Sequence, residues 1–244
     1  MVRKAAGVPD SKIGEIRNFS TKIEAYNTNR INEQRVDRNY YEDNFEVGIT
    51  DPFHVVRTGT SARVVDSIID HLELSNPQVF QKPRKNTEAA RKSSAKIAKF
   101  LNKLIQQFMP EITEFTRNLV LYGEAVGQVQ YNNQYSDGLD DSVPLMFTAP
   151  DPMNMFCWPY DVLVPQKVVK KFMMKEMALH GMIPEWKGEV LAGEVDYLAY
   201  WDKDTRYIEA GKTALSKGNN GVEVNYLKFV SFVHCYSGFG KKSA

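Results

Sequence analysis

Residues 84–131 carry the clearest alternation of hydrophobic and polar positions in the chain. Apolar side chains first repeat at the spacing of one helical face, at Ile97, Ala98, Leu101, Leu104, Ile105 and Phe108. Pro110 then suits the first turn of a second predicted helix, Glu111 to Tyr122. Gly123 ends this helix, and from Val126 to Tyr131 the period changes to two. The pattern therefore predicts a helix, a second helix and a strand in direct succession.

The opposite face of the first predicted helix is basic. On a wheel of about 100° per residue, Lys92, Lys96, Lys99 and Lys103 fall within a sector of about 60°. Four more basic residues precede them, namely Lys82, Arg84, Lys85 and Arg91. Such a basic stripe is typical of the solvent-facing side of a helix. The alternative interpretation is that it contacts phosphates or an acidic partner. Because the stripe is mostly lysine, any attraction to DNA is expected to be salt-sensitive and blind to sequence.

The N-terminal pattern predicts a helical arm and a linker over residues 1–50. Asp10 or Ser11 can cap a helix whose apolar stripe is Ile13, Ile16, Phe19, Ile23 and Tyr26. A stripe this thin rarely stabilises a free helix, so we expect the arm to lie on the body of the protein or on a neighbouring subunit. Residues 37–52 mix acidic and aromatic side chains and end in a turn, which indicates a connection.

The remaining pattern, over residues 51–244, alternates helices and hairpins. A short strand is expected at His54 to Thr58, followed by a helix that Thr60 or Ser61 caps and that Ser75-Asn76-Pro77 closes. The polar segment 132–142 predicts a hairpin loop before a strand at Val143 to Thr148. Proline-rich residues 149–165 are expected to run extended.

The C-terminal third predicts mainly strands. Residues 167–180 fit either a short helix or an edge strand. Val195 to Trp201 and Arg206 to Glu209 predict a hairpin, and a turn at 218–221 leads into a strand from Val222 to His234. The expected fold class is α+β, with long amphipathic helices packed against β-hairpins and a small mixed sheet.

Composition narrows the function classes. The chain has 244 residues, is 43% hydrophobic and carries a formal charge of +1, so attraction to nucleic acid would have to come from local patches. Cys157 and Cys235 are too few for a disulfide scaffold or a thiolate zinc site, and they suit a reducing compartment. The polar N-terminus and the prolines of 143–160 predict a soluble, non-secreted protein without a membrane span.

A phosphate-binding loop is the first catalytic motif to weigh. Gly211-Lys212-Thr213 resembles the end of such a loop, in which backbone amides wrap the phosphates and the lysine neutralises them. The motif needs a glycine five residues before Gly211, where Arg206 stands, and a helix after it, for which there is no room. An ordinary turn is the favoured interpretation.

Other catalytic or metal-binding patterns are also incomplete. Ser237 lacks the glycine two residues earlier that a nucleophile elbow requires, and the adjacent His234 and Cys235 would point to opposite faces of a strand. Acidic residues in the predicted 132–142 loop lack the order of a calcium loop; they are Asp137, Asp140 and Asp141. The four histidines are far apart in sequence; they are His54, His71, His180 and His234. We expect no catalytic residue, cofactor or metal.

The order of these features resembles the wing region of the portal proteins of tailed bacteriophages over residues 50–240. The resemblance rests on the helix Ala62–Leu74, the long basic helix, Leu121-Tyr122-Gly123-Glu124-Ala125 with its strand, Ala149-Pro150-Asp151-Pro152-x-Asn154, Trp158-Pro159 and the closing Phe232-Val233-His234-Cys235-Tyr236-Ser237-Gly238-Phe239-Gly240. It implies a non-enzymatic protein whose copies, usually about twelve, form a ring at one capsid vertex. Stem, clip and crown would lie beyond residue 244.

The resemblance also implies partners and a location. Viral DNA would be packaged and ejected through the ring, which would contact the major capsid protein, the terminase large subunit and head-completion or adaptor proteins. The protein would be assembled in the host cytoplasm and reside in the virion. Two alternatives remain open: a nucleotide-binding enzyme that uses Gly211-Lys212-Thr213, and a sequence-nonspecific nucleic-acid-binding module that uses the basic residues at 82–103.

Overall fold

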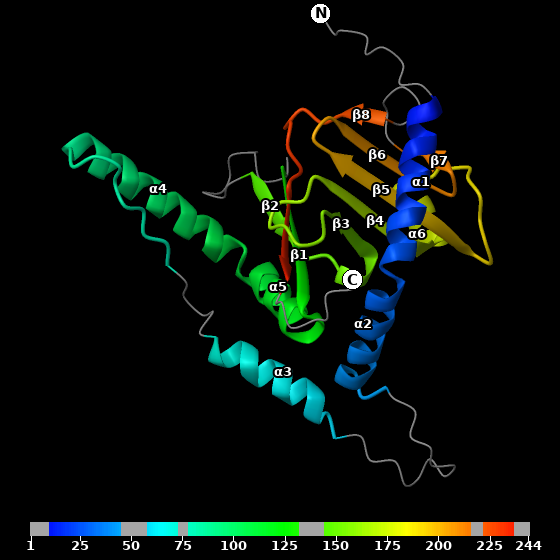
Figure 1. Cartoon of the computed structure of the whole chain (residues 1–244), viewed down its shortest axis with the longest axis horizontal. Coiled ribbons are helices and arrows are strands. Elements are labelled where there is room, and N and C mark those ends of the chain that lie inside the picture. Colours follow the sequence, from blue (N-terminus) through cyan, green and yellow to red (C-terminus); the bar gives the residue numbers. More distant parts are fainter. Residues whose placement is uncertain (1–9, 45–57, 73–77, 132–143, 216–221, 237–244) are drawn as a thin grey trace, which may run out of the picture. The chain divides into compact units, whose positions relative to one another are not determined.

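A computed structural model describes residues 10–44, 58–72, 78–131, 144–215 and 222–236 (Figure 1). The protein has an α+β fold, as predicted. The chain forms two compact units, each built from separate parts of the sequence. Unit 1 combines Met1–Arg35 with Pro150–Cys235, and unit 2 combines Val36–Ala149 with Tyr236–Ala244. This division differs from the predicted one into residues 1–50 and 51–244, because the N-terminal helix shares a core with strands that begin more than a hundred residues later.

Unit 1 is built on an antiparallel sheet of six strands. Its order is β3-β4-β5-β6-β7, with β8 beside β6. The strands are β3 (Met155–Trp158), β4 (Lys167–Lys175), β5 (Glu194–Asp202), β6 (Thr205–Ala210), β7 (Thr213–Ala214) and β8 (Val222–Val224). Every neighbouring pair in this sheet is antiparallel, so the predicted mixed sheet is wrong here. Short turns link β5 to β6 and β6 to β7, which favours the antiparallel arrangement of these strands.

Helix α1 (Asp10–Tyr26) packs on this sheet, which confirms that the arm lies on the body of the protein (Figure 1). Ile16 and Ile23 are buried in one cluster with residues of β3, β4, β5, β6 and β8. Two polar links add to this contact, from Arg17 to Glu209 and from Glu24 to Lys171. The thin apolar stripe of α1 is thus sufficient to hold this helix on the sheet, because the two ion pairs add to the apolar contact.

Helix α2 (Thr28–Tyr41) corrects the prediction of a connection from residue 37 onward. Its sequence, TNRINEQRVDRNYY, offers almost no apolar stripe, so periodicity could not reveal it. Tertiary contacts hold it instead. Arg30 donates hydrogen bonds from Nη1 to the carbonyl of Pro152 at 3.3 Å and from Nη2 to that of Met155 at 2.9 Å.

The ambiguous segment 167–180 contains both a strand and a helix. Strand β4 runs to Lys175, and helix α6 (Glu176–Met182) begins at the next residue. The predicted long strand from Val222 to His234 is wrong, because it is split into β8 and β9 (Phe232–Tyr236). Asn225 ends β8: its Nδ2 donates to the carbonyls of Asp202 at 2.7 Å and Phe229 at 2.8 Å, which closes a turn.

Unit 2 follows the predicted order of helices and strands. It contains α3 (Thr60–His71), α4 (Glu88–Gln107), α5 (Met109–Tyr122), β1 (Glu124–Tyr131) and β2 (Leu145–Thr148). Thr87 caps α4, and Gly123 ends α5 in the left-handed conformation, with φ of 66°. β1 and β2 pair antiparallel from Gln128↔Thr148 to Tyr131↔Leu145. The helix–helix–strand succession is confirmed.

Aromatic rings fill the space between α5 and the β1–β2 hairpin of unit 2. The ring of Phe147 lies 6.2 Å from that of Phe108 and 6.0 Å from that of Phe115. Gly127 leaves room for it, since a Cβ atom there would lie 2.5 Å from the Phe147 ring. Several predictions lie outside the described residues: the 132–142 loop with Asp137, Asp140 and Asp141, all but the last residue of the strand His54 to Thr58, the turns at 75–77 and 218–221, and the segment from Ser237 to Gly240.

Candidate functional site

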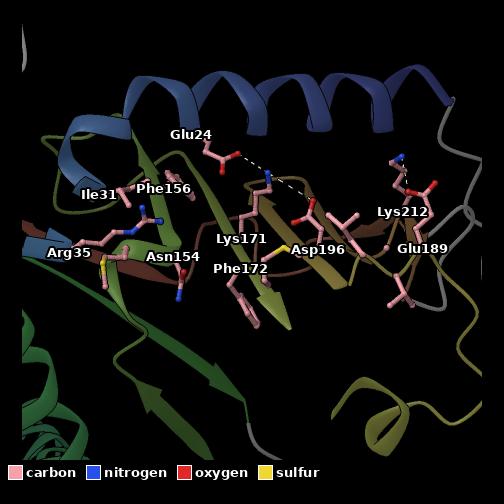
Figure 2. Close-up of a pocket in the computed structure, with 15 residues that line it drawn as sticks. Glu24, Ile31, Arg35, Asn154, Phe156, Lys171, Phe172, Glu189, Asp196 and Lys212 are labelled. Atoms are coloured by element: carbon pink, nitrogen blue, oxygen red, sulfur yellow. Dashed lines mark hydrogen bonds and ion pairs between the residues drawn. The ribbon is translucent and has the colours of Figure 1, made fainter. Parts of the chain in front are cut away.

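A cavity lies within unit 1, between helices α1 and α2 and the sheet (Figure 2). Its volume is about 710 Å³. Helices, strands and turns of unit 1 all contribute to the lining, with Glu24, Ile31, Arg35, Met153, Asn154, Phe156, Lys171, Phe172, Met173, Glu189, Val190, Leu191, Asp196, Gly211 and Lys212. The lining mixes apolar and charged side chains, which is the composition of a binding pocket rather than of a packing defect.

Charged side chains form a short line across this pocket. Lys171 Nζ lies 2.7 Å from a carboxylate oxygen of Glu24 and 4.0 Å from one of Asp196 (Figure 2). Burial raises the pKa of Asp196, although the positive charge of Lys171 opposes this shift. Two carboxylates therefore share one ammonium group, and this end of the pocket carries a surplus of negative charge.

Beside the pocket, a buried network fixes α1 to β6. Arg17 donates from Nη2 to Glu209 Oε2 at 2.6 Å and from Nε to the same carboxylate at 3.0 Å. Tyr207 donates its hydroxyl to Glu209 at 2.7 Å. The paired carboxylate raises the pKa of Arg17, and burial with the Glu209 hydrogen bond raises that of Tyr207. Arg17 Nη2 also donates to the carbonyl of Lys212 at 3.2 Å, so the network ties α1 both to β6 and to the turn that follows it.

Gly211-Lys212-Thr213 forms the turn between β6 and β7. Gly211 and Lys212 have positive φ angles of 51° and 60°, which a two-residue hairpin turn requires. Lys212 pairs with Glu189 at 2.8 Å, and Thr213 begins β7 instead of a helix. A Cβ atom at Gly211 would also collide with the backbone of Glu189. The glycine is explained by the turn, and the amides that would wrap a phosphate are not arranged around a helix N-terminus.

The predicted basic residues lie on helix α4 and on the segment before it, in unit 2. Lys82, Arg84, Lys85, Arg91, Lys92, Lys96 and Lys99 are exposed, and Lys103 is partly buried. Lys92 pairs with Glu88 one turn earlier at 2.8 Å, an exposed pair of little energetic weight. The structure therefore leaves most of these side chains accessible to solvent without showing what they bind.

The remaining candidate nucleophiles and ligands are dispersed. His234 is 2% exposed and packs its ring 5.1 Å from that of Tyr160, whereas burial raises the pKa of the Cys235 thiol. A raised thiol pKa disfavours the thiolate, so Cys235 is a poor nucleophile. His180 lies 3.6 Å from Glu176 in unit 1, and His71 belongs to unit 2. Within the described ranges, no three His, Cys, Asp or Glu side chains converge as metal ligands would.

Sequence reasoning did not find the pocket, because its lining residues come from segments far apart in the chain. The one usable indication was the sequence KVVKKFMMK, for which an edge strand was one of two interpretations. The geometry provides binding surfaces and no assembled acid, base and nucleophile among the described side chains.

Among the helices that the structure describes, none has the length and apolar character needed to cross a bilayer. Comparison with protein-family models found no match, and comparison with curated proteins found none either.

Proposed function

We propose that this chain is a structural, non-enzymatic portal protein of the tailed-bacteriophage type. Its copies would form a ring, of about twelve subunits in that family, at one vertex of the capsid. Viral DNA would pass through the ring during packaging and ejection. The ring would bind the major capsid protein, the terminase large subunit and head-completion or adaptor proteins, after assembly in the host cytoplasm.

The observation that carries the proposal is the exposed apolar surface of helix α3 in unit 2. Val64, Ile68 and Leu72 recur every four residues and are 54%, 43% and 51% exposed. Residues at this spacing lie on one face of a helix, so they form a continuous apolar stripe. Exposed apolar stripes of this kind are typical of surfaces that bind another protein. We name Val64, Ile68 and Leu72 the α3 stripe.

Helix α4 supports the same interpretation. Ile97 and Phe100 are 45% and 47% exposed, although α4 has a strong amphipathic pattern that predicts burial. Neighbouring copies in a ring would cover both helices through heterologous contacts, in which different surfaces of one chain meet. The order α3, α4, α5, the turn at Gly123 and β1 also follows the order of features in the portal wing.

Negative-stain imaging of the purified chain and of two variants tests the proposal. We expect closed rings for the unaltered protein and their loss in Ile68→Glu, because a charge would then be buried between subunits. Ser67→Glu is the matched control, since it places the same charge one residue earlier on the same helix, away from the stripe. Circular dichroism should be unchanged in both variants. Equal assembly of Ile68→Glu and the unaltered protein contradicts this use of the α3 stripe.

The exposed lysines support contact with DNA as a separate part of this function. Reversing Lys92, Lys96 and Lys99 to Glu is expected to weaken binding to duplex DNA and to flatten its dependence on salt. Because these side chains are exposed, ring formation should persist in the triple variant. If the triple variant binds duplex DNA with unchanged affinity and salt dependence, these lysines of α4 only face solvent and do not contact DNA.

A further inference from the structure

An exposed apolar patch lies on the turn that follows β8 in unit 1. Tyr226 is 89% exposed, Leu227 58% and Phe229 55%. Aromatic side chains offer about 150–250 Å² each, so the two rings alone leave on the order of 200–350 Å² in water. Exposed apolar patches of this size commonly mark binding sites. We name residues 226–229 the knob.

Hydrogen bonds within the turn hold the knob in one conformation. Asn225 Nδ2 donates to the carbonyls of Asp202 at 2.7 Å and Phe229 at 2.8 Å. The amide of Leu227 donates to Asn225 Oδ1 at 3.2 Å. A partner therefore meets a preformed surface, and binding does not have to order the turn.

Lys228 is the one charged residue of the knob, and the turn itself does not require it. Its φ angle is 58°, a left-handed conformation that glycine adopts at no steric cost and that lysine adopts rarely. Its ammonium group lies 3.4 Å from the carboxylate of Asp204, in an exposed pair of small energetic weight. Neither feature explains a lysine at this position, which is consistent with a contact outside the chain.

The pocket of unit 1 offers a suitable surface for such a turn. Its volume of about 710 Å³ is that of pockets that enclose drug-sized molecules, so it has room for the side chains of a protruding turn. Met173, Val190 and Leu191 are apolar lining residues that remain exposed to solvent. Large aromatic side chains that fill a partly apolar pocket are the usual anchors of protein interfaces.

The charges of the two surfaces are complementary. Lys171 lies 2.7 Å from Glu24 and 4.0 Å from Asp196, so two carboxylates share one ammonium group in this part of the pocket. The side chain of Asp196 is 54% exposed and can accept a second cation. Lys228 brings one positive charge to the knob, and an ion pair with Asp196 would balance both surfaces.

The other charged residues of the lining do not provide this second cation. Lys212 pairs with Glu189 at 2.8 Å. Arg35 belongs to α2, and Figure 2 shows it on the other side of Lys171 from Asp196. In the described part of the chain, Lys171 alone forms an ion pair with Asp196.

The knob cannot reach the pocket of its own chain. Asn225 anchors the knob to Asp202 at one end of β5, whereas Asp196 lies near the other end of this strand. The two aspartates are six positions apart, which is about 20 Å along a strand. The two surfaces therefore meet only between molecules. Because they lie at opposite ends of one unit, their contact joins copies head to tail, and such contacts form rings when the rotation closes.

We propose that the knob of one copy inserts into the unit 1 pocket of the next copy. Tyr226 and Leu227 enter the pocket over its apolar lining, and Lys228 pairs with Asp196. This contact rests on the proposed assembly of copies into a ring, and it gives the ring a pair of surfaces that is separate from the α3 stripe.

Reversing the two charges tests the contact. Lys228→Glu places two carboxylates together in every contact, and Asp196→Lys places two ammonium groups together. Each variant alone should therefore need about tenfold or more protein to form rings. In an equimolar mixture, every contact between unlike copies pairs a carboxylate with an ammonium group, so rings of alternating copies should return. Mass photometry of the full chain across a dilution series measures both effects.

Two further variants serve as a control and a second test. Lys203→Glu makes the same charge change beside the knob, where Lys203 also pairs with Asp204, and it should leave ring formation unchanged. Tyr226→Ser should raise the protein concentration needed for rings about tenfold or more, because it removes an aromatic anchor. Tyr226 is almost fully exposed, so its replacement leaves the fold intact and tests the contact even if Asp196→Lys does not fold.

The results distinguish this contact from the ring itself. Unchanged ring formation by Lys228→Glu or by Tyr226→Ser would overturn the knob–pocket contact and leave the α3 stripe as the ring surface. Folded single variants that fail to recover when mixed would overturn it as well. An unaltered chain that is monomeric at every concentration would overturn both this contact and the proposed ring.

Discussion

The two units of this protein use amphipathic helices in opposite ways. In unit 1, the apolar stripe of α1 is covered by the sheet, and Ile16 and Ile23 are 2% and 5% exposed. In unit 2, α3 has a more pronounced amphipathic pattern, yet only Ile69 among its residues is buried. An amphipathic sequence thus shows that a helix needs a partner surface, but it does not say whether this surface lies in the same chain.

The largest expected difference in the free energy of unfolding comes from placing a charge in the core of unit 1 and, for comparison, on the exposed α3 stripe of unit 2. Val169→Asp in β4 should unfold unit 1, with a loss of about 4 kcal/mol or more, because Val169 is fully buried. Ile68→Asp on the α3 stripe should change the free energy of unfolding of a subunit by less than about 0.5 kcal/mol. Chemical denaturation of dilute protein measures both. Similar losses in the two variants would show that the α3 stripe is covered within the chain.

The next effect concerns the ion pair that holds α1 to the sheet. Arg17→Ala should cost about 3 kcal/mol, because it leaves the buried carboxylate of Glu209 without its cation. Lys12→Ala on the same helix breaks an exposed pair with Glu15 at 3.7 Å and should cost less than about 0.5 kcal/mol. Thermal unfolding of the two variants compares them. A loss for Arg17→Ala no larger than for Lys12→Ala would contradict the proposed role of the pair.

Replacing one glycine by alanine in each unit should change the free energy of unfolding by a smaller amount, with opposite signs in the two units. Gly127→Ala should destabilise unit 2 by about 1–3 kcal/mol, because the new methyl group meets the ring of Phe147. Gly14→Ala in α1 has open space around it and should stabilise unit 1 by about 0.5–1 kcal/mol through its helix propensity. Urea denaturation checks the sign of each change. Stabilisation by Gly127→Ala would show that the Phe147 contact is not close.

The smallest expected effect depends on pH. The pKa of Asp196 is raised by burial, so the folded state holds its proton more tightly than the unfolded chain. The free energy of unfolding should therefore fall as the pH rises from the unfolded toward the folded pKa. Asp196→Asn should remove this fall, with a gain below about 1 kcal/mol at neutral pH, since Asp196 is half-exposed. A parallel pH profile for the variant would contradict this assignment.

Local patterns in the sequence predicted much of the fold. The basic helix, the boundary at Pro110 and Gly123, the β5–β6 hairpin and α1 each follow from spacing and cap residues over a short window. Helix α2 was missed because its stability comes from Arg30 and other tertiary contacts rather than from a stripe. The break between β8 and β9 was missed because it depends on the side chain of Asn225, which bonds residues on both sides.

Long-range organisation was harder to predict for a physical reason. Unit 1 joins α1 to strands that follow residue 150, and nothing in either segment alone specifies the other. The pocket depends on the same pairing, since Glu24 and Lys171 meet only when α1 lies on β4. The exposed basic residues were found in advance because a helical stripe is local. Their contact with DNA stays a prediction.

The most direct test of the central claim is the mass of the full chain in solution across a wide dilution series, measured by mass photometry. If copies cover the exposed helices of unit 2, a closed oligomer with one defined subunit number should dominate and should dissociate on dilution without unfolding. A strictly monomeric, folded protein at every concentration would contradict the ring assignment and the role given to the α3 stripe.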